Sequence, residues 1–244
     1  MKTVQEWLLK FNQYFNNISS NKAPGLNKYE ISVFLSDAQD AVVLALCNGT
    51  LGKSFESTEE VTNFLAPLVK QAQWVKEGSN NTITKVTNPD YQIASDSVVF
   101  QLPDNVLHRT YEECFLSVSS NCPNQQANVV PVTQDEFWRT RRNPFRRDNG
   151  SRVLRLAYAK TELDNNDAAE TTKYSELVSR YEILKYVVRY VSRPEPIILT
   201  DLSEINANLK IRGCQDPTPC KLDEALHEAI LAEAVKLAKA VWNT

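Results

Sequence analysis

Two groups of residues have types and spacings that could bind a metal or a nucleotide. Cys214, Cys220 and His227 could supply three metal ligands, but five residues between the cysteines is not a usual zinc spacing, and two reduced thiols beside a turn are the better interpretation. The stretch from Gly49 to Ser54 resembles a phosphate loop, but only two residues separate its glycines where that loop needs four. We therefore expect no metal and no cofactor.

The residues that catalysis would need are also sparse. The sequence contains two histidines and lacks both HExxH and GxSxG. Asp201, Glu204 and His227 are the residues that a small hydrolase would use, yet no spacing connects them to a partner group. We predict that the protein is not an enzyme, and hydrolysis stays the minority hypothesis.

One stretch carries much more positive charge than its surroundings. In WRTRRNPFRR and the residues that follow, aromatic side chains alternate with arginines, and the candidate site residues are Arg139, Arg141, Arg142, Phe145, Arg146, Arg147, Arg152 and Arg155. Arginine beside aromatic rings suits phosphate backbones and stacked bases, and it equally suits the anchors of a protein interface. Because the net charge of the chain is -3, we favour an interface over direct DNA contact by about two to one.

Several helices must frame this segment. Apolar residues at helical spacing predict helices over 3–17, 27–47, 57–72 and from Asp223 onward. Asn27 with Glu30 forms a capping pattern at the second helix, and Pro67 is expected to bend or break the third. We expect the last helix to complete a bundle with the first three.

From Gly78 the apolar period changes to that of strands. Short β-rich segments bounded by Asn, Asp, Pro and Ser predict several antiparallel strands, interrupted by a short helix over Thr133–Thr140 that a capping box would open. The longest strand begins at Tyr181 and ends before Pro194 and Pro196, which cannot donate to a ladder. The predicted fold class is α+β, with a helical region at 1–77, a central antiparallel β region at 78–213 and a C-terminal helix at 214–244 that packs on the helical region.

Length and composition fit this architecture. A chain of 244 residues with 42% hydrophobic content can bury one sizeable core or two modest ones. No stretch approaches the ~20 apolar residues of a membrane span, and the first residues lack the features of a cleaved signal. We therefore expect synthesis in the cytoplasm, no membrane partner, and free thiols at an odd number of cysteines.

An ordered set of strings carries a family resemblance. KYEISVFLSDAQDAVV, SFESTEEVTNFLAPLVKQ, FWRTRRNPFRR with RVLRL, YVVRYVSRPEPIIL and LHEAILAEAVKLA resemble the ring proteins of the neck and tail of crAss-like bacteriophages. The resemblance implies a virion structural protein that assembles into a closed ring of twelve copies beneath the portal and forms part of the channel for genome and cargo ejection. It also implies further copies, the portal, adjacent ring proteins and double-stranded DNA as partners, after synthesis in the host cytoplasm.

Under this resemblance the two unusual segments acquire expected roles. The arginine-rich segment would pair with acidic residues of a neighbour or face DNA in the channel. An extension between subunits would be formed by Arg193, Pro194, Pro196, Ile197 and Ile198. The alternative hypothesis is a DNA-binding or packaging accessory protein that acts through Arg139 to Arg155, and steeply salt-dependent binding to DNA would favour it.

Overall fold

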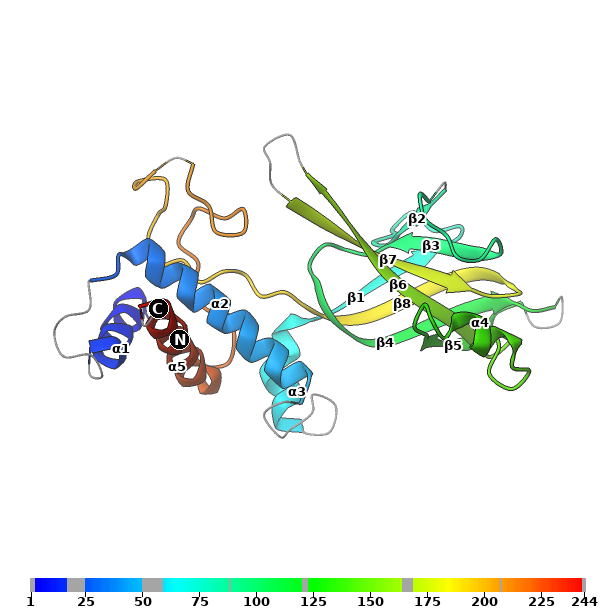
Figure 1. The fold of residues 1–244 in the computed structure, drawn as a ribbon, viewed down its shortest axis with the longest axis horizontal. Coiled ribbons are helices and arrows are strands. Elements are labelled where there is room, and N and C mark those ends of the chain that lie inside the picture. Colours follow the sequence, from blue (N-terminus) through cyan, green and yellow to red (C-terminus); the bar gives the residue numbers. More distant parts are fainter. Residues whose placement is uncertain are drawn as a thin grey trace. The chain divides into compact units, whose positions relative to one another are not determined.

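A computed structural model describes residues 3–16, 25–49, 59–87, 89–119, 123–163, 169–206 and 208–242. The chain divides into two compact units, unit 1 with Met1–Val69 and Arg193–Thr244, and unit 2 with Lys70–Ser192. Unit 2 is therefore one continuous stretch, and unit 1 is assembled from residues on both sides of it in the sequence (Figure 1).

Unit 1 contains three helices that pack together, α1 (Val4–Asn16), α2 (Lys28–Cys47) and α5 (Glu224–Trp242). The predicted capping box opens α2: the Asn27 side chain accepts from the Glu30 amide at 2.8 Å, and the Glu30 carboxylate accepts from the Asn27 amide at 2.8 Å. The buried face of α1 carries aromatic side chains at helical spacing, Trp7, Phe11 and Phe15. The predictions of these three helices are confirmed.

Unit 2 is an eight-stranded sheet with the order β1-β8-β4-β5-β6-β7-β3-β2. Its strands are β1 (Val69–Val75), β2 (Thr84–Val86), β3 (Ser97–Gln101), β4 (Val106–Ser117), β5 (Gln125–Pro131), β6 (Arg152–Leu163), β7 (Ala169–Val178) and β8 (Glu182–Ser192). The pairs β2–β3, β3–β7, β4–β5, β4–β8 and β6–β7 are antiparallel. β5 and β6 run parallel, so the sheet is mixed.

The two ends of this strand order approach each other, and the sheet forms a nearly closed barrel. The Gln73 carbonyl on β1 accepts from the amides of Thr82 (3.0 Å) and Ile83 (3.1 Å), just before β2. In the interior, the Phe100 ring lies 5.1 Å from the Trp74 ring and 5.2 Å from the Tyr186 ring, centroid to centroid. One aromatic core therefore connects β1, β3 and β8.

The predicted fold class, a helical bundle with a central antiparallel β region, is wrong. The dominant architecture is the mixed sheet of unit 2, in which Asn128 to Pro131 pair in parallel register with Arg152 to Arg155. A parallel pair needs a crossover connection, and α4 (Phe137–Arg142) supplies it between β5 and β6. The expected capping box of this helix does not form, because Glu136 is the N-cap and makes no side-chain capping bond.

The third predicted helix is also wrong over its second half. α3 spans only Glu59–Leu65, Pro67 lies in a 3-10 turn over Ala66–Leu68, and β1 begins at Val69. Proline interrupts the helical hydrogen bonds, and after it the buried side chains of Ala72 and Trp74 follow the two-residue period of a strand. The Ser57 cap predicted for this helix lies outside the described residues.

Cys47, at the end of α2, is expected to resist alkylation. Burial raises the pKa of its thiol to about 11, because a buried site disfavours the thiolate. The folded pKa of this thiol lies above the unfolded value of about 8.5. The contribution of the Cys47 thiol to the stability of the folded state is therefore fully present below about pH 8.5, and it is lost as the pH rises towards the folded pKa. At pH 8, peptide mass spectrometry after iodoacetamide treatment should show slower labelling of Cys47 than of the half-buried Cys214. Equal rates would contradict the burial argument.

Candidate interaction surface

The aromatic side chain of Phe137 anchors the short helix α4 in unit 2. Phe137 is completely buried and packs in a cluster with Leu154, Leu156 and Val178. Leu154 and Leu156 alternate with the side chains of the opposite face along β6, so they present an apolar row to α4. With Phe137 buried, the residues that follow it are placed on the outside of the unit.

The turn after α4 projects an exposed ring. The amides of Arg146 (3.1 Å) and Arg147 (2.9 Å) donate to the Asn143 carbonyl, and the Phe145 amide donates to the Asn143 side chain at 3.0 Å. This turn leaves Phe145 87% exposed, and Trp138 on α4 is 51% exposed. Large exposed aromatic side chains beside arginines are typical of interface anchors.

The predicted arginines separate into two groups, and the first remains on this surface. Arg139, Arg142 and Arg146 are exposed, and Arg139 pairs with Glu136 at 3.0 Å. Among the described residues, no carboxylate pairs with Arg142 or Arg146. We define the arginine–aromatic surface as Trp138, Arg139, Arg142, Phe145 and Arg146.

The arginines of the second group are buried more deeply, and most of them bind other residues of unit 2. Arg141 forms an ion pair with Asp96, and its guanidinium lies 5.9 Å from the Phe137 ring centroid. Arg152 donates to the Phe145 carbonyl at 2.9 Å, and it lines a hollow of about 340 Å³ together with Arg146. Arg147 is half-buried. Arg155 joins a separate charged cluster, so the structure does not unite all eight predicted residues.

The predicted extension lies against α2 in its own subunit. Of its residues Arg193 is exposed, whereas Pro194, Pro196, Ile197 and Ile198 are buried. The amides of Ile197 and Leu199 donate to the hydroxyls of Ser36 and Ser32, each at 3.0 Å. A contact between subunits through the buried residues of this segment would require them to leave α2.

A buried carboxylate fixes the same region. The Asp40 side chain accepts from Arg193 Nε at 2.8 Å and from Arg212 Nη1 at 2.9 Å. Arg212 and Gly213 have positive φ values of 53° and 82°, as a two-residue turn between the paired residues Ile211 and Cys214 requires. The guanidinium of Arg212 also donates to the Ser36 carbonyl at 3.1 Å, which holds this turn on α2.

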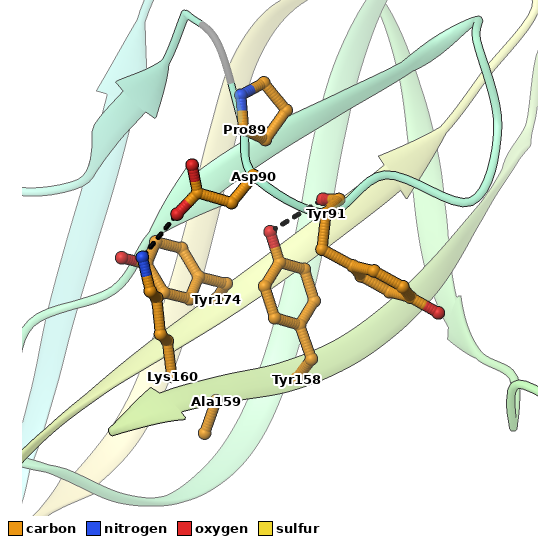
Figure 2. Close-up of a pocket in the computed structure, with 7 residues that line it drawn as sticks. All are labelled: Pro89, Asp90, Tyr91, Tyr158, Ala159, Lys160 and Tyr174. Atoms are coloured by element: carbon orange, nitrogen blue, oxygen red, sulfur yellow. Dashed lines mark hydrogen bonds and ion pairs between the residues drawn. The ribbon is translucent and has the colours of Figure 1, made fainter. Parts of the chain in front are cut away.

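A tyrosine-lined pocket on unit 2 was not predicted. Figure 2 shows Tyr158 and Tyr174 side by side, with ring centroids 5.1 Å apart, and Tyr91 meeting the edge of Tyr158 at 5.5 Å. Lys160 forms an ion pair with Asp90 across the pocket, whose volume is about 390 Å³. Tyr158 and Tyr174 are register partners on β6 and β7. They lie sixteen residues apart in the sequence, and nothing but the register brings them together.

A charged cluster in the sheet was also missed. Glu112 on β4 pairs with Arg155 Nη1 at 3.0 Å and lies 3.7 Å from Arg109 Nη1. The Tyr186 hydroxyl donates to the same carboxylate, and burial together with Glu112 raises the pKa of Tyr186 well above its usual value, which keeps it a donor. These charges line a hollow of about 440 Å³. The acidic pair Glu112 and Glu113 was visible in the sequence, but its arginine partners were not.

The described residues offer little support for other chemistry. Within them, no group of three His, Cys, Asp or Glu side chains could hold a metal ion. His227 is buried with Nε2 3.2 Å from the Leu222 carbonyl, and Asp201 accepts from the Ser203 hydroxyl and amide. Gly49 follows the C-cap of α2 with a φ of 68°, and Gly52, Lys53 and Ser54 lie outside the described residues. No described helix is long and apolar enough to cross a membrane.

Comparison with known proteins identifies the class of protein. The chain belongs to the phage tail ring protein 3/4 family, which matches residues 2–244. It is 36% identical over 241 residues to ring protein 3 of Bacteroides phage crAss001, covering 97% of this chain and 94% of that protein. It is 30% identical over 243 residues to ring protein 4/5 of the same phage, covering 98% and 93%. The resemblance to ring proteins of crAss-like phages is confirmed, and these homologues support a structural ring protein of the virion.

Proposed function

We propose that this protein is the subunit of a closed ring of twelve copies in the head-to-tail connector, below the portal, and that the ring surrounds part of the path for genome and cargo ejection. The observation that carries the proposal is the family match over residues 2–244. A ring made from one kind of chain needs two different complementary faces on each subunit. The arginine–aromatic surface supplies one such face, because it exposes Phe145 together with Arg142 and Arg146, with which no carboxylate of the described residues pairs.

Copy number in the particle tests this function. Quantitative mass spectrometry of purified, nuclease-treated particles would compare this chain with the major capsid protein. About twelve copies per particle, or a small multiple, is the expected result for a closed ring at one vertex. Absence from particles would contradict the structural role, and hundreds of copies would place the chain in the shell instead.

Direct DNA contact is a second candidate, favoured by the exposed Arg142 and Arg146. Arg141 and Arg155 are already paired with Asp96 and Glu112, so fewer phosphates can be neutralised than the seven arginines between 139 and 155 suggest. Binding of the isolated chain to duplex DNA at several salt concentrations separates the two functions. A steep fall of affinity with salt would support DNA contact, and no binding at low salt would exclude it.

A further inference from the structure

The charged hollow between β4, β5 and β6 holds two guanidinium groups and one carboxylate. Arg109 and Arg155 have side chains that are 16% and 14% exposed, and the side chain of Glu112 is 8% exposed. A buried charge is costly unless an opposite charge pairs with it. Among the described residues, the two positive charges of this hollow therefore share a single carboxylate.

The distances to Glu112 identify Arg109 as the arginine in excess. One oxygen of Glu112 forms an ion pair with Arg155 Nη1 at 3.0 Å, and the other oxygen accepts a hydrogen bond from Tyr186. Arg109 Nη1 is 3.7 Å from Glu112, which is too far for a hydrogen bond. Within the described residues, neither Arg109 Nη1 nor Arg155 Nε has a hydrogen-bond partner. Burial lowers the pKa of Arg109; the Glu112 carboxylate opposes this effect, and the charge of Arg155 adds to it.

The hollow is open and bounded by groups that suit an incoming acidic side chain. Its volume is about 440 Å³, and Asn128, Val129 and Pro131 form its β5 wall. Tyr111 at its edge is 42% exposed. The planar fork of a guanidinium matches a carboxylate, and such charge-assisted pairs are strong when they are partly desolvated.

We propose that this hollow receives a carboxylate, presented by an Asp or Glu side chain of the neighbouring copy of this chain in the ring. The proposal rests on the ring proposed above. A second copy fits because the contacts of a ring are heterologous, so the hollow of one copy meets a different face of the next copy. That face belongs to a chain with thirty acidic residues. A carboxylate at the tip of a side chain can enter this hollow more readily than a phosphate of a duplex, because the side chains of Arg109 and Arg155 are only 16% and 14% exposed.

The isolated chain tests the carboxylate chemistry without the ring. Sodium acetate would replace sodium chloride at constant ionic strength, and the unfolding midpoint temperature would be measured. We expect acetate to raise the midpoint by roughly 1–3 °C, because a ligand that binds only the folded state stabilises it. Arg109→Met should remove this response. Arg189→Met is the matched control, because it removes an exposed arginine from the adjacent strand β8, at the register partner of Tyr111, and should keep the response.

The same variant separates binding from a purely structural role. In chloride, Arg109→Met leaves Glu112 with Arg155 and Tyr186, so the midpoint should stay unchanged or rise by about 2–4 °C. A fall of several degrees would show that Arg109 serves the fold, and an acetate response that persists in Arg109→Met would place the anion elsewhere. Either result overturns the proposal without affecting the copy number in particles.

Cross-linking in assembled particles tests the partner. A photoreactive benzoylphenylalanine in place of Tyr111 should capture a peptide of this same protein that contains an Asp or Glu. Capture of a different ring protein, or of nucleotide, would overturn the assignment to a second copy. The absence of any cross-link from position 111 in particles of normal composition would also overturn it, provided that benzoylphenylalanine in place of the exposed Phe145 does form a cross-link.

Discussion

Replacing Arg142 and Arg146 by glutamate is expected to prevent the assembly of infectious particles while the isolated chain stays folded. Both side chains are exposed and flank Phe145, and within the described residues neither has a carboxylate partner. Reversal would place like charges against a complementary surface, at a cost of several kcal/mol. We therefore expect the yield of infectious particles to fall by roughly 100-fold or more, measured by plaque titre and by the copies of the chain in purified particles.

The choice of arginines decides what this experiment measures. Arg141 is a poor target, because its ion pair with Asp96 and its contact with Phe137 belong to unit 2 itself. Lys70→Glu with Arg189→Glu makes the same change in net charge at exposed positions outside the arginine–aromatic surface. Normal particles from Arg142→Glu/Arg146→Glu would remove the interface role of this surface. Equal losses from both double variants would attribute the effect to net charge.

A second large effect is expected in unit 1, from replacing Ser32 and Ser36 by alanine. The two hydroxyls accept from the amides of Leu199 and Ile197, and all four groups are buried. Without the hydroxyls, two backbone amides would remain buried and unsatisfied, at about 1–3 kcal/mol each. Residues four apart on one helix face thus hold alternate amides of an extended segment, as a neighbouring strand would.

Hydrogen exchange is the measurement that resolves this effect by unit. The amides of Ile197 and Leu199 should lose protection in Ser32→Ala/Ser36→Ala, while the amide of Val188 in unit 2 should not change. Ser203→Ala is the control, since its exposed hydroxyl bonds to Asp201 on the surface of the same unit and should cost no more than about 0.5 kcal/mol. Unchanged protection in the double variant would show that the serines do not hold the segment.

Local sequence signals predicted many of the elements. The capping box at Asn27 and the alternation in β8 are each encoded within a few residues, and both are present. The mixed sheet was not predictable in the same way, because the parallel register of β5 and β6 is set by contacts that α4 separates in the sequence. For β1 the two-residue period begins only after Pro67, and Leu68, Val69 and Ala72 also fit the spacing of a helix.

The candidate site shows the same division. The cluster of arginines is evident in the sequence. Its division into an exposed group and a group paired within unit 2 is not, because that division depends on strand geometry. Arg152 and Arg155 are an odd number of residues apart on β6 and therefore face opposite sides of the strand. One side chain remains near Phe145, and the other enters the hollow with Glu112. The tyrosine pocket and the serine contacts likewise depend on residues that are distant in the sequence.

The division of unit 1 around unit 2 has a consequence for the order of events at the ribosome. α1 and α2 emerge early, but their partner α5 is translated only after all of unit 2, and the ion pair between Lys10 and Glu228 spans 218 residues. The apolar faces of the early helices therefore stay uncovered throughout most of synthesis, a state in which chains are prone to aggregate. A nascent chain that stops before residue 224 can complete the strand pairings of the sheet but not the helix packing. A chaperone bound to residues 4–47 during translation would protect the apolar faces of α1 and α2 from aggregation, and it would be released when α5 arrives.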